Sequence, residues 1–280
     1  MTTYLNKPVL VVCDIDGTLT HDGSINPSAY TLDIIRQLHD NGIGFGVASG
    51  RSDEQLLEMY NSWGLDFDID LIIGGNGTEY YDGKTKENKI LYVLDKEDVK
   101  EIITSMLDKF PDLNCSIYRD GMRLLRFEDQ MAVQSKKRNK MNNMIVEDIS
   151  LMWNQDCHKV MFRVSEDVMR QIEPYANSLN NDRYRCCKTQ STMMEFVHRK
   201  ADKGNALKRY CEDNKINLND VWSFGDFIND NELLLVAGHG VCMINGDEDT
   251  KKCANAITEL DNNHDGFAKY MVDNLLKYLS

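Results

Sequence analysis

The sequence has little proline and no long apolar run. Four prolines and eighteen glycines among 280 residues exclude collagen-like and proline-rich architectures. The longest apolar runs, such as residues 9–13, are far shorter than the roughly 20 residues that a membrane-spanning helix needs. With 42% hydrophobic and 28% charged residues, the chain has the ordinary composition of a globular protein with a sizeable core.

Positive charge is also scarce. The 32 Lys and Arg residues stand against 45 Asp and Glu residues, which gives a net charge of −13 and a pI near 4.9. So acidic a surface repels nucleic-acid phosphates and anionic membranes, and we expect neither as a partner. A small phosphorylated metabolite is still compatible with this charge if the binding site concentrates positive charge locally.

The cysteines lack the spacing of metal or redox motifs. Eight cysteines are scattered along the chain, and the adjacent Cys186 and Cys187 match neither a Cys-x-x-Cys redox motif nor a zinc site. The first residues show no basic region followed by an apolar stretch and a cleavage site, so we expect no secretory leader. The simplest interpretation is a cytoplasmic protein with free thiols, present as a monomer or a weak homo-oligomer.

Both ends of the chain alternate strands and helices, a pattern typical of a parallel α/β sheet of the Rossmann-like kind. The apolar run Val9–Cys13 predicts a strand buried on both faces. Asn26 is predicted to cap the helix that follows, with Pro27 in its first turn. Further strands are predicted at 45–48, 71–73, 221–224 and 240–244, and further helices at 52–63, 204–214, 229–237 and 266–278.

The middle of the chain has a different pattern, in which short strands in hairpins are mixed with helices. Helices are predicted at 96–109, 131–143 and 167–179, and strands at 114–118, 123–127, 160–164, 184–188 and 193–197. This mixture indicates an α+β module over residues 85–196, inserted into a core formed by residues 1–84 and 197–280. We expect the inserted module to act as a lid or cap over the core.

Two aspartates, Asp14 and Asp16, follow the first predicted strand. The carboxyl ends of strands are where open α/β sheets bind ligands. Two carboxylates there repel each other unless a cation compensates, and Mg²⁺ prefers such oxygen ligands. The alternative is an ordinary turn, because aspartate before glycine is common in turns.

Three further segments are predicted to reach the same edge of the sheet. Ser49-Gly50-Arg51 follows the second strand, Lys203 opens a helix, and residues 225–230, with Asp226 and Asp230, follow a later strand. Each alone has an ordinary explanation, since Ser49 could simply cap a helix and Lys203 could lie on the surface. Their convergence with the first aspartate pair is what indicates a site for a phosphate group.

In these four segments the sequence resembles the haloacid dehalogenase superfamily of phosphohydrolases. The resemblance is greatest to its Cof-type branch, which carries a large α/β cap inserted after the third strand. Asn76-Gly77 and the closing residues Asn263-His264-Asp265-Gly266-Phe267-Ala268 add to it. The resemblance covers nearly the whole chain, although the cap matches only in length and general pattern. It implies a Rossmann-like core of the haloacid dehalogenase fold with an inserted α+β cap domain.

The resemblance also implies roles for individual residues. Asp14 would be the nucleophile that forms an aspartyl-phosphate, and Asp16 would protonate the leaving alcohol and later deprotonate water. Lys203 would neutralise charge on the phosphate and on the nucleophile. The implied Mg²⁺ ligands are Asp14, the backbone carbonyl of Asp16 and Asp226, with Asp230 in the surrounding shell.

The same resemblance places further residues around the substrate. The implied phosphate-binding residues are Ser49, Gly50, Lys203 and Asn229, although Asn229 could instead orient the metal's surroundings. Arg51 and Asn76 would face the substrate, although Arg51 could instead support the loop that carries it. Thr18 would fix the loop after the first strand.

The sequence therefore predicts a Mg²⁺-dependent phosphatase acting on a small phosphomonoester, such as a sugar phosphate or a phosphorylated cofactor. One alternative is a phosphomutase of the phosphomannomutase type, whose core and cap are arranged similarly. Another is a non-catalytic protein that binds phosphorylated ligands. A P-loop kinase is favoured less than any of these, because the chain contains no glycine-rich stretch ending in Gly-Lys-Ser/Thr.

Overall fold

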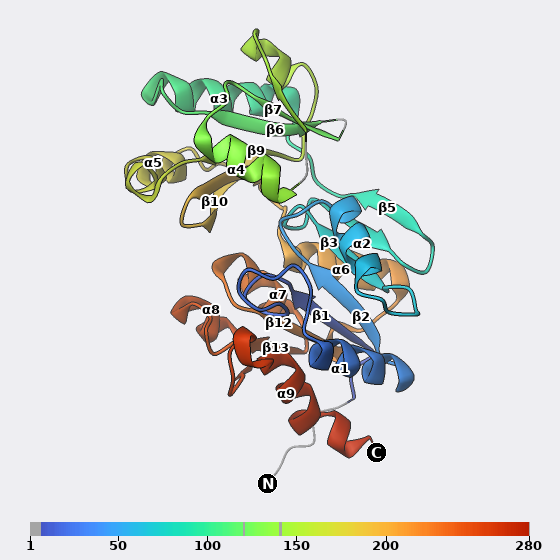
Figure 1. The fold of residues 1–280 in the computed structure, drawn as a ribbon. Helices are drawn as coiled ribbons and strands as arrows, with labels where there is room; N and C mark the ends of the chain where they lie inside the picture. Colours follow the sequence, from blue (N-terminus) through green and yellow to red (C-terminus); the bar gives the residue numbers. More distant parts are fainter. Residues whose placement is uncertain (1–6, 120, 140–141, 280) are drawn as a thin grey trace. The chain divides into compact units, whose positions relative to one another are not determined.

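The computed structural model describes residues 7–119, 121–139 and 142–279 (Figure 1). It divides into two compact units, one formed by the chain up to Leu91 and from Asp202 onward, the other by Tyr92–Ala201. These limits lie beyond the predicted boundaries after residues 84 and 196. The reason is that the strand Glu87–Ile90 pairs within the first unit, while the strand Met193–His198 runs past residue 196 in the second.

The first unit is built on an eight-stranded sheet in the order β14-β13-β12-β1-β2-β3-β4-β5. Neighbouring strands are parallel from β14 to β3, and β4 and β5 are antiparallel additions at one edge. In spatial order the strands are β14 (Ala256–Ile257), β13 (His239–Cys242), β12 (Val221–Gly225), β1 (Leu10–Asp14), β2 (Gly44–Ala48), β3 (Leu71–Gly74), β4 (Glu79–Asp82) and β5 (Glu87–Ile90). The central strand is therefore the one that ends in Asp14.

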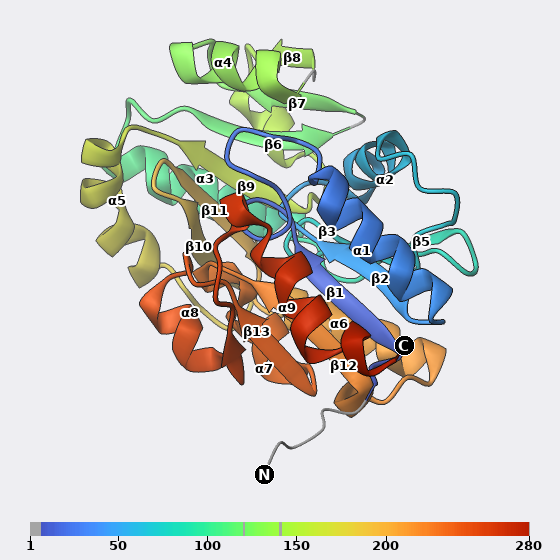
Figure 2. The ribbon, with the colours of Figure 1, turned by 60° about the horizontal axis from the view of Figure 1, so that its bottom comes forward.

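Helices cover both faces of this sheet. The helices are α1 (Ala29–Asp40), α2 (Asp53–Ser62), α6 (Lys203–Asn214), α7 (Asn231–Val236), α8 (Glu248–Cys253) and α9 (Gly266–Asn274). On one face Val11 of β1 belongs to a core with residues of α1, α2 and α9, and Figure 2 shows α1 and α9 side by side. On the other face Val12 packs in a core with residues of α6 and α7. Side chains of β1 thus alternate between two apolar cores.

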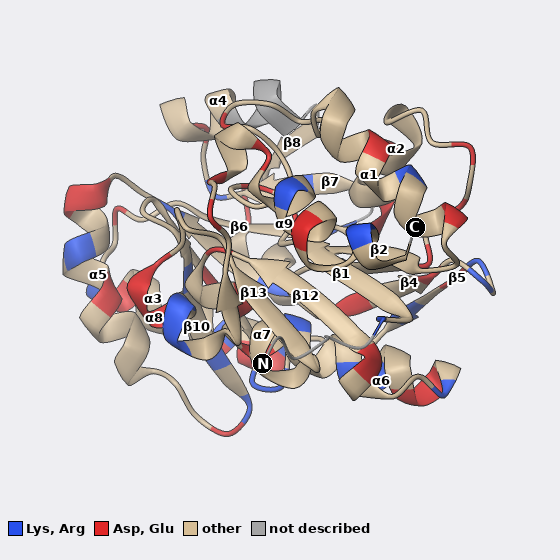
Figure 3. Ribbon diagram, turned by 90° about the horizontal axis from the view of Figure 1, so that it is seen from below, with Lys and Arg blue, Asp and Glu red and all other residues tan. Residues whose placement is uncertain are grey.

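Charges are absent from most of the central strands. β2, β12 and β13 contain no Lys, Arg, Asp or Glu and are tan throughout in Figure 3, where the charged residues lie mainly on helices and in loops. Such strands are expected where a parallel sheet is buried on both faces. The predicted parallel α/β core is therefore confirmed.

Two local predictions in this unit are wrong. Asn26 does not cap α1, because Ser28 holds that position and its Oγ accepts a hydrogen bond from the Thr31 N–H at 3.0 Å. The helix predicted over 229–237 is divided into a 3₁₀ turn, Ile228–Asp230, followed by α7. The division frees the carboxylate of Asp230 to bond backbone N–H groups of the preceding turn.

The second unit contains a six-stranded sheet in the order β10-β11-β9-β6-β7-β8. Its strands are β6 (Cys115–Arg119), β7 (Met122–Leu125), β8 (Asn142–Ile145), β9 (Lys159–Arg163), β10 (Tyr184–Gln190) and β11 (Met193–His198). Its helices are α3 (Lys96–Lys109), α4 (Gln130–Asn139) and α5 (Glu166–Ser178), of which α3 and α5 share an apolar core with the sheet. The helix predicted over 131–143 is too long, because Asn142 and Asn143 belong to β8. No helix in the described part of the chain is long and apolar enough to cross a membrane.

A buried pair of carboxyl groups joins α2 to β4. Asp53 and Glu79 are 5% and 6% exposed, and the Asp53 N–H donates to Glu79 Oε1 at 3.2 Å. They pack against β3, since a Cβ on Gly74 would lie 2.9 Å from Glu79 Oε1. Burial, followed by the charge of Glu79, raises the pKa of Asp53 from 3.8 to about 7.

This pair predicts a pH-dependent stability. In the unfolded chain Asp53 loses its proton above pH 3.8, whereas in the folded chain it keeps the proton up to about pH 7. The contribution of Asp53 to the free energy of unfolding is therefore present at low pH and is lost as the pH rises through 7. We expect Asp53→Asn to increase the free energy of unfolding at pH 8 by at least about 1.4 kcal/mol, the value of one pKa unit.

Urea unfolding of the wild type and of Asp53→Asn, at pH 5 and pH 8, measures this difference. Glu58→Gln is the matched control, because Glu58 lies exposed on the same helix. The prediction would be contradicted if the gain in the free energy of unfolding from Asp53→Asn were no larger at pH 8 than at pH 5.

Candidate active site

Four segments of the first unit meet at the carboxyl edge of its parallel strands. Asp14 ends β1, Ser49 directly follows β2, and Asp226 directly follows β12. β1 lies between β12 and β2 in the sheet, so these three strand ends are neighbours. Lys203, the first residue of α6, reaches the same place. The predicted convergence of these segments is thus present in the structure.

Lys203 is fully buried and forms two ion pairs. Its Nζ lies 2.5 Å from Asp14 Oδ1 and 2.5 Å from Asp230 Oδ1. Burial by itself lowers the pKa of Lys203, but the carboxylates of Asp14 and Asp230 outweigh it, so that its pKa lies above the ordinary value. Lys203 is therefore a fixed positive charge, and the surface alternative for this residue is excluded.

A third carboxylate, that of Asp226, lies close to the two that pair with Lys203. Asp14, Asp226 and Asp230 each offer one oxygen, and these oxygens lie within 4.8 Å of one another. Burial first, and then the charge of Asp230, raises the pKa of Asp226 to about 7, and burial likewise raises the pKa of Asp14. The excess of negative charge and the oxygen donors fit a hard divalent cation. The cluster is thus a suitable metal site.

Asp230 also fixes the loop after β12. Its Oδ2 accepts hydrogen bonds from the N–H groups of Asp226 and Phe227 at 3.0 and 3.1 Å, while its Oδ1 pairs with Lys203. A Cβ on Gly225 would lie 2.5 Å from the Cβ of Asp230, so a side chain there would displace it. With both oxygens engaged, Asp230 is better placed to orient Asp226 and Lys203 than to bind an ion directly.

The loop after β1 is in direct contact with Asp226. Thr18 Oγ1 donates to Asp226 Oδ1 at 2.9 Å. Gly17 has φ +88°, and a Cβ on it would lie 2.5 Å from Asp226 Oδ2. Glycine is required here both for its left-handed backbone and for this close approach. The structure therefore gives Thr18 the loop-fixing contact that the sequence predicted.

Asp16 stands in a different environment from Asp14. Its side chain is 60% exposed, whereas the whole Asp14 residue is only 7% exposed. Arg51 pairs with Asp16 through both terminal nitrogens, at 2.7 and 2.9 Å. Arg51 thus contacts the second aspartate of the motif. Two carboxylates in unlike surroundings can carry different chemical duties.

The remaining predicted residues form a connected group beside Ser49. Asn76, which has φ 56°, donates its N–H to the Ser49 carbonyl at 2.9 Å, and its Oδ1 accepts from Asn229 Nδ2 at 3.2 Å. A Cβ on Gly50 would lie 3.0 Å from Asn76 Nδ2. Ser49, Gly50, Asn76 and Asn229 are therefore brought together from three different loops.

One residue that the sequence analysis missed also reaches the site. Asn245 follows β13, and its Nδ2 donates to the Gly17 carbonyl at 2.8 Å. Asn245 could have been found from its position after another predicted parallel strand, 240–244, because that strand ends at the same edge of the sheet. No charged side chain marked it.

Curated proteins of known name match the chain along most of its length. It is 28% identical to the chloroplastic endoribonuclease YBEY of Arabidopsis thaliana over 95% of this chain, but it spans only 46% of that longer protein. It is 27% identical to an HMP-PP phosphatase of Yersinia pseudotuberculosis, covering 84% of each chain.

Solved structures match the fold. A haloacid dehalogenase-like hydrolase from Bacteroides thetaiotaomicron, 24% identical, has a TM-score of 0.79 and covers 95% of this chain and 99% of its own. The haloacid dehalogenase subclass IIB sugar phosphatase BT4131, 20% identical, has a TM-score of 0.78 and covers 96% and 98%. The predicted fold, a parallel α/β core with a second sheet in an inserted cap domain, is confirmed.

The family itself is shown by a match along the sequence. The family model for haloacid dehalogenase-like hydrolases matches residues 11–271, which include every predicted site residue. The resemblance stated from the four motifs is therefore confirmed. This chain belongs to the haloacid dehalogenase-like hydrolase family.

Proposed function

We propose that this enzyme is a Mg²⁺-dependent phosphatase that hydrolyses small phosphomonoesters by way of a phosphorylated Asp14. The observation that carries the proposal is the arrangement around Asp14. This carboxylate is buried, pairs with the buried ammonium of Lys203 at 2.5 Å, and lies beside Asp226 and Asp230. A carboxylate held between a fixed cation and a metal-binding cluster is suited to attack a phosphoryl group whose charge both would neutralise.

Asp14, Asp226 and the backbone carbonyl of Asp16 would hold the Mg²⁺ ion. Asp230 would orient Asp226 by accepting a hydrogen bond from its N–H. When bound, the ion would neutralise charge on the phosphoryl group and relieve the repulsion among the carboxylates. Burial, and after it the charges of the neighbouring carboxylates, raises the pKa values of Asp14 and Asp226, and a bound cation would oppose both effects.

In the first step an Asp14 carboxylate oxygen forms a bond to phosphorus, and the bond from phosphorus to the ester oxygen breaks. The electron pair remains on the departing oxygen, which takes a proton from Asp16. Arg51 pairs with Asp16 in this structure, and its guanidinium would stabilise the carboxylate that Asp16 becomes when it gives up the proton. Lys203 keeps Asp14 in place and stabilises the charge on the transferring group.

In the second step a water molecule attacks the phosphorus of phosphorylated Asp14. Asp16, now ionised, removes a proton from that water as its oxygen bonds to phosphorus. The bond from phosphorus to the Asp14 oxygen then breaks, which releases inorganic phosphate and restores the carboxylate. Ser49, the Gly50 N–H and Asn229 are proposed to hold the phosphoryl oxygens through both steps.

The substrate is proposed to be a sugar phosphate or a phosphorylated cofactor. This is supported by two proteins that the chain is similar to, one named an HMP-PP phosphatase and the other a sugar phosphatase. The inserted unit, residues 92–201, would select among such substrates as a cap domain. Free thiols on all eight cysteines support a reducing compartment, and we propose the cytoplasm.

Asp14→Asn removes the proposed nucleophile with almost no change of volume. We expect kcat/KM for p-nitrophenyl phosphate with Mg²⁺ to fall at least about 1,000-fold, while the protein stays folded because Lys203 keeps its ion pair with Asp230. Asp40→Asn, an exposed aspartate at the end of α1, is the control and should keep full activity. Normal hydrolysis by Asp14→Asn would show that the nucleophile is another residue.

Removal of divalent cations should abolish hydrolysis. EDTA is expected to stop phosphate release, excess Mg²⁺ to restore it, and Asp226→Asn to raise the Mg²⁺ concentration needed by at least about tenfold. Mg²⁺ should also raise the melting temperature of the wild type, because an ion that binds only the folded state stabilises it. Full activity in EDTA would remove the metal from the mechanism.

The products distinguish the phosphatase from the phosphomutase alternative. With a panel of sugar phosphates, nucleotides and phosphorylated vitamins, we expect at least one compound to release one equivalent of inorganic phosphate per substrate consumed. Isomerised sugar phosphate without free phosphate would establish a mutase. Binding of these compounds without any turnover would establish a binding protein instead.

A further inference from the structure

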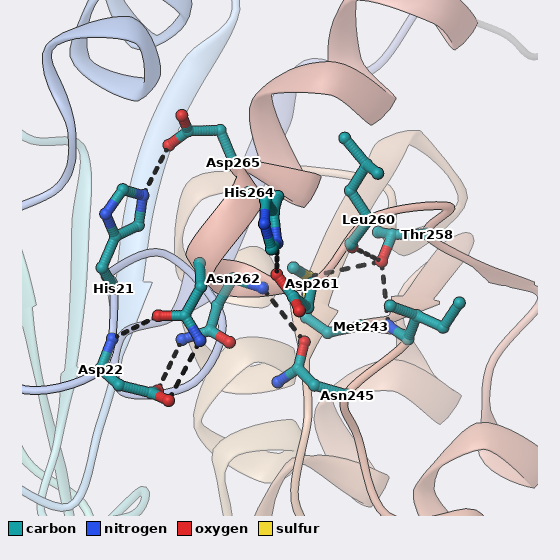
Figure 4. Close-up of polar contacts among 12 residues, drawn as sticks. His21, Asp22, Met243, Asn245, Thr258, Leu260, Asp261, Asn262, His264 and Asp265 are labelled. Atoms are coloured by element: carbon teal, nitrogen blue, oxygen red, sulfur yellow. Dashed lines mark hydrogen bonds and ion pairs between the residues drawn. The ribbon is translucent and has the colours of Figure 1, made fainter.

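Of the closing residues, a name we extend to 261–268, those from 263 onward strengthened the family resemblance, and none is used by the chemistry above. In the structure, residues 261–265 lie beside the loop that follows β1, residues 15–22, which we name the Asp16 loop (Figure 4). The Asp16 loop is irregular backbone, and it carries the proposed general acid. Side chains from the closing residues, together with Asn245, hold it by a series of hydrogen bonds.

Asn245 contacts the residue next to Asp16. Its Nδ2 donates to the Gly17 carbonyl at 2.8 Å, and its Oδ1 accepts from the Asn262 N–H at 3.1 Å. Asn245 is itself exposed. The amide therefore joins the Asp16 loop to the closing residues without contributing to either apolar core.

Asn262 contacts the far side of the same loop. It is 3% exposed, and its Nδ2 donates to the Thr20 carbonyl and to Asp22 Oδ1, both at 2.9 Å. Asn263 adds a reciprocal pair, donating to Asp22 Oδ2 at 3.0 Å and accepting from the Asp22 N–H at 2.9 Å. Thr20 forms an isolated β-bridge with Asp16, so the Thr20 contact acts on the backbone that pairs with the general acid.

The closing residues are themselves firmly fixed. Asp265, in the left-handed region with φ 55°, accepts from Thr31 Oγ1 at 3.2 Å and lies 3.1 Å from His21 Nε2. Phe267, two residues later, is buried with its ring 4.9 Å from that of Phe224. Asn262 therefore extends from a rigid base and can impose a position on the loop that it contacts.

We propose that Asn245 and Asn262 are positioning residues that set the place of the Asp16 carboxyl group for proton transfer to the leaving oxygen. The proposal rests on the proposed function. The two asparagines bind the carbonyls of Gly17 and Thr20, on the chain just after Asp16, whereas the Asp16 side chain is 60% exposed and depends on its loop for its position. A proton donor misplaced by about 1 Å can cost on the order of 100-fold in rate.

The test compares two substrates that differ in their need for a proton. p-Nitrophenolate leaves readily without protonation, whereas the alkoxide of glycerol 2-phosphate does not. We expect Asn245→Ala to lower kcat/KM for glycerol 2-phosphate at least about tenfold and for p-nitrophenyl phosphate at most about twofold. Asn262→Ala should show the same selectivity. If the buried Asn262 proves necessary for folding, the exposed Asn245 still allows the positioning role to be tested.

Asn255→Ala is the matched control. Asn255 is an exposed asparagine whose Oδ1 accepts from the Gly240 N–H at 2.7 Å, so its contact is with β13 rather than with the Asp16 loop. It should leave the ratio of the two kcat/KM values unchanged. An Asn245→Ala variant with wild-type activity, or with equal losses on both substrates, would overturn the positioning role while leaving the proposed function intact.

A further variant distinguishes failure of the positioning role from failure of the proposed function. Asp16→Asn should reproduce the selective loss on glycerol 2-phosphate in stronger form, because it removes the proton itself. If the wild type hydrolyses neither substrate, or if Asp16→Asn loses both equally, the proposed function or its general acid is wrong, and the positioning role fails with it.

Discussion

The site depends on the burial of one positive charge. Lys203 has no exposed surface, and a buried ammonium group is stable only when its charge is paired and hydrogen-bonded. Asp14 and Asp230 supply that pairing, and they lie 189 and 27 positions from Lys203 in the sequence. Breaking such a buried pair typically costs about 3–5 kcal/mol, because the remaining charge is left uncompensated. Lys203 therefore ties the two chain ends together while creating the electrostatic environment of Asp14.

The parallel sheet makes this arrangement possible. Because β12, β1 and β2 are neighbours and point the same way, short loops after each strand bring Asp226, Asp14 and Ser49 together. The inserted unit occupies the chain between β5 and α6 and takes no part in the pairing of these strands. All the residues assigned to the candidate site thus come from the two ends of the chain.

Two aspartates that are only two residues apart stand in unequal environments, which would suit them to the different roles proposed for them. Asp14 lies in a crowded, buried cluster whose charge balance favours an added cation, whereas Asp16 is exposed and pairs with Arg51. The Asp16 loop is held by asparagine amides, which donate hydrogen bonds without adding charge to an already crowded site.

The sequence predicted the parallel core and the inserted module, because apolar strands followed by polar residues leave a clear pattern. The ten residues assigned to the site came partly from that pattern and partly from the family resemblance, on which Gly50, Asn76 and Asn229 depended. The roles of those residues stay predictions. β4 and β5 were missed since Glu79–Asp82 and Glu87–Ile90 are short and polar, and their pairing depends on the edge that β3 offers. The Asp53–Glu79 pair and Asn245 were missed because each depends on contacts between segments distant in sequence.

The central claim is that Asp14 becomes phosphorylated during turnover. Rapid acid quenching of the enzyme with Mg²⁺ and an accepted phosphomonoester, followed by borohydride reduction, converts a phosphorylated aspartate to homoserine, which peptide mass spectrometry can locate. The account predicts homoserine at position 14, dependent on substrate. Homoserine at another position, or continued hydrolysis with no trapped residue at any quench time, would contradict it.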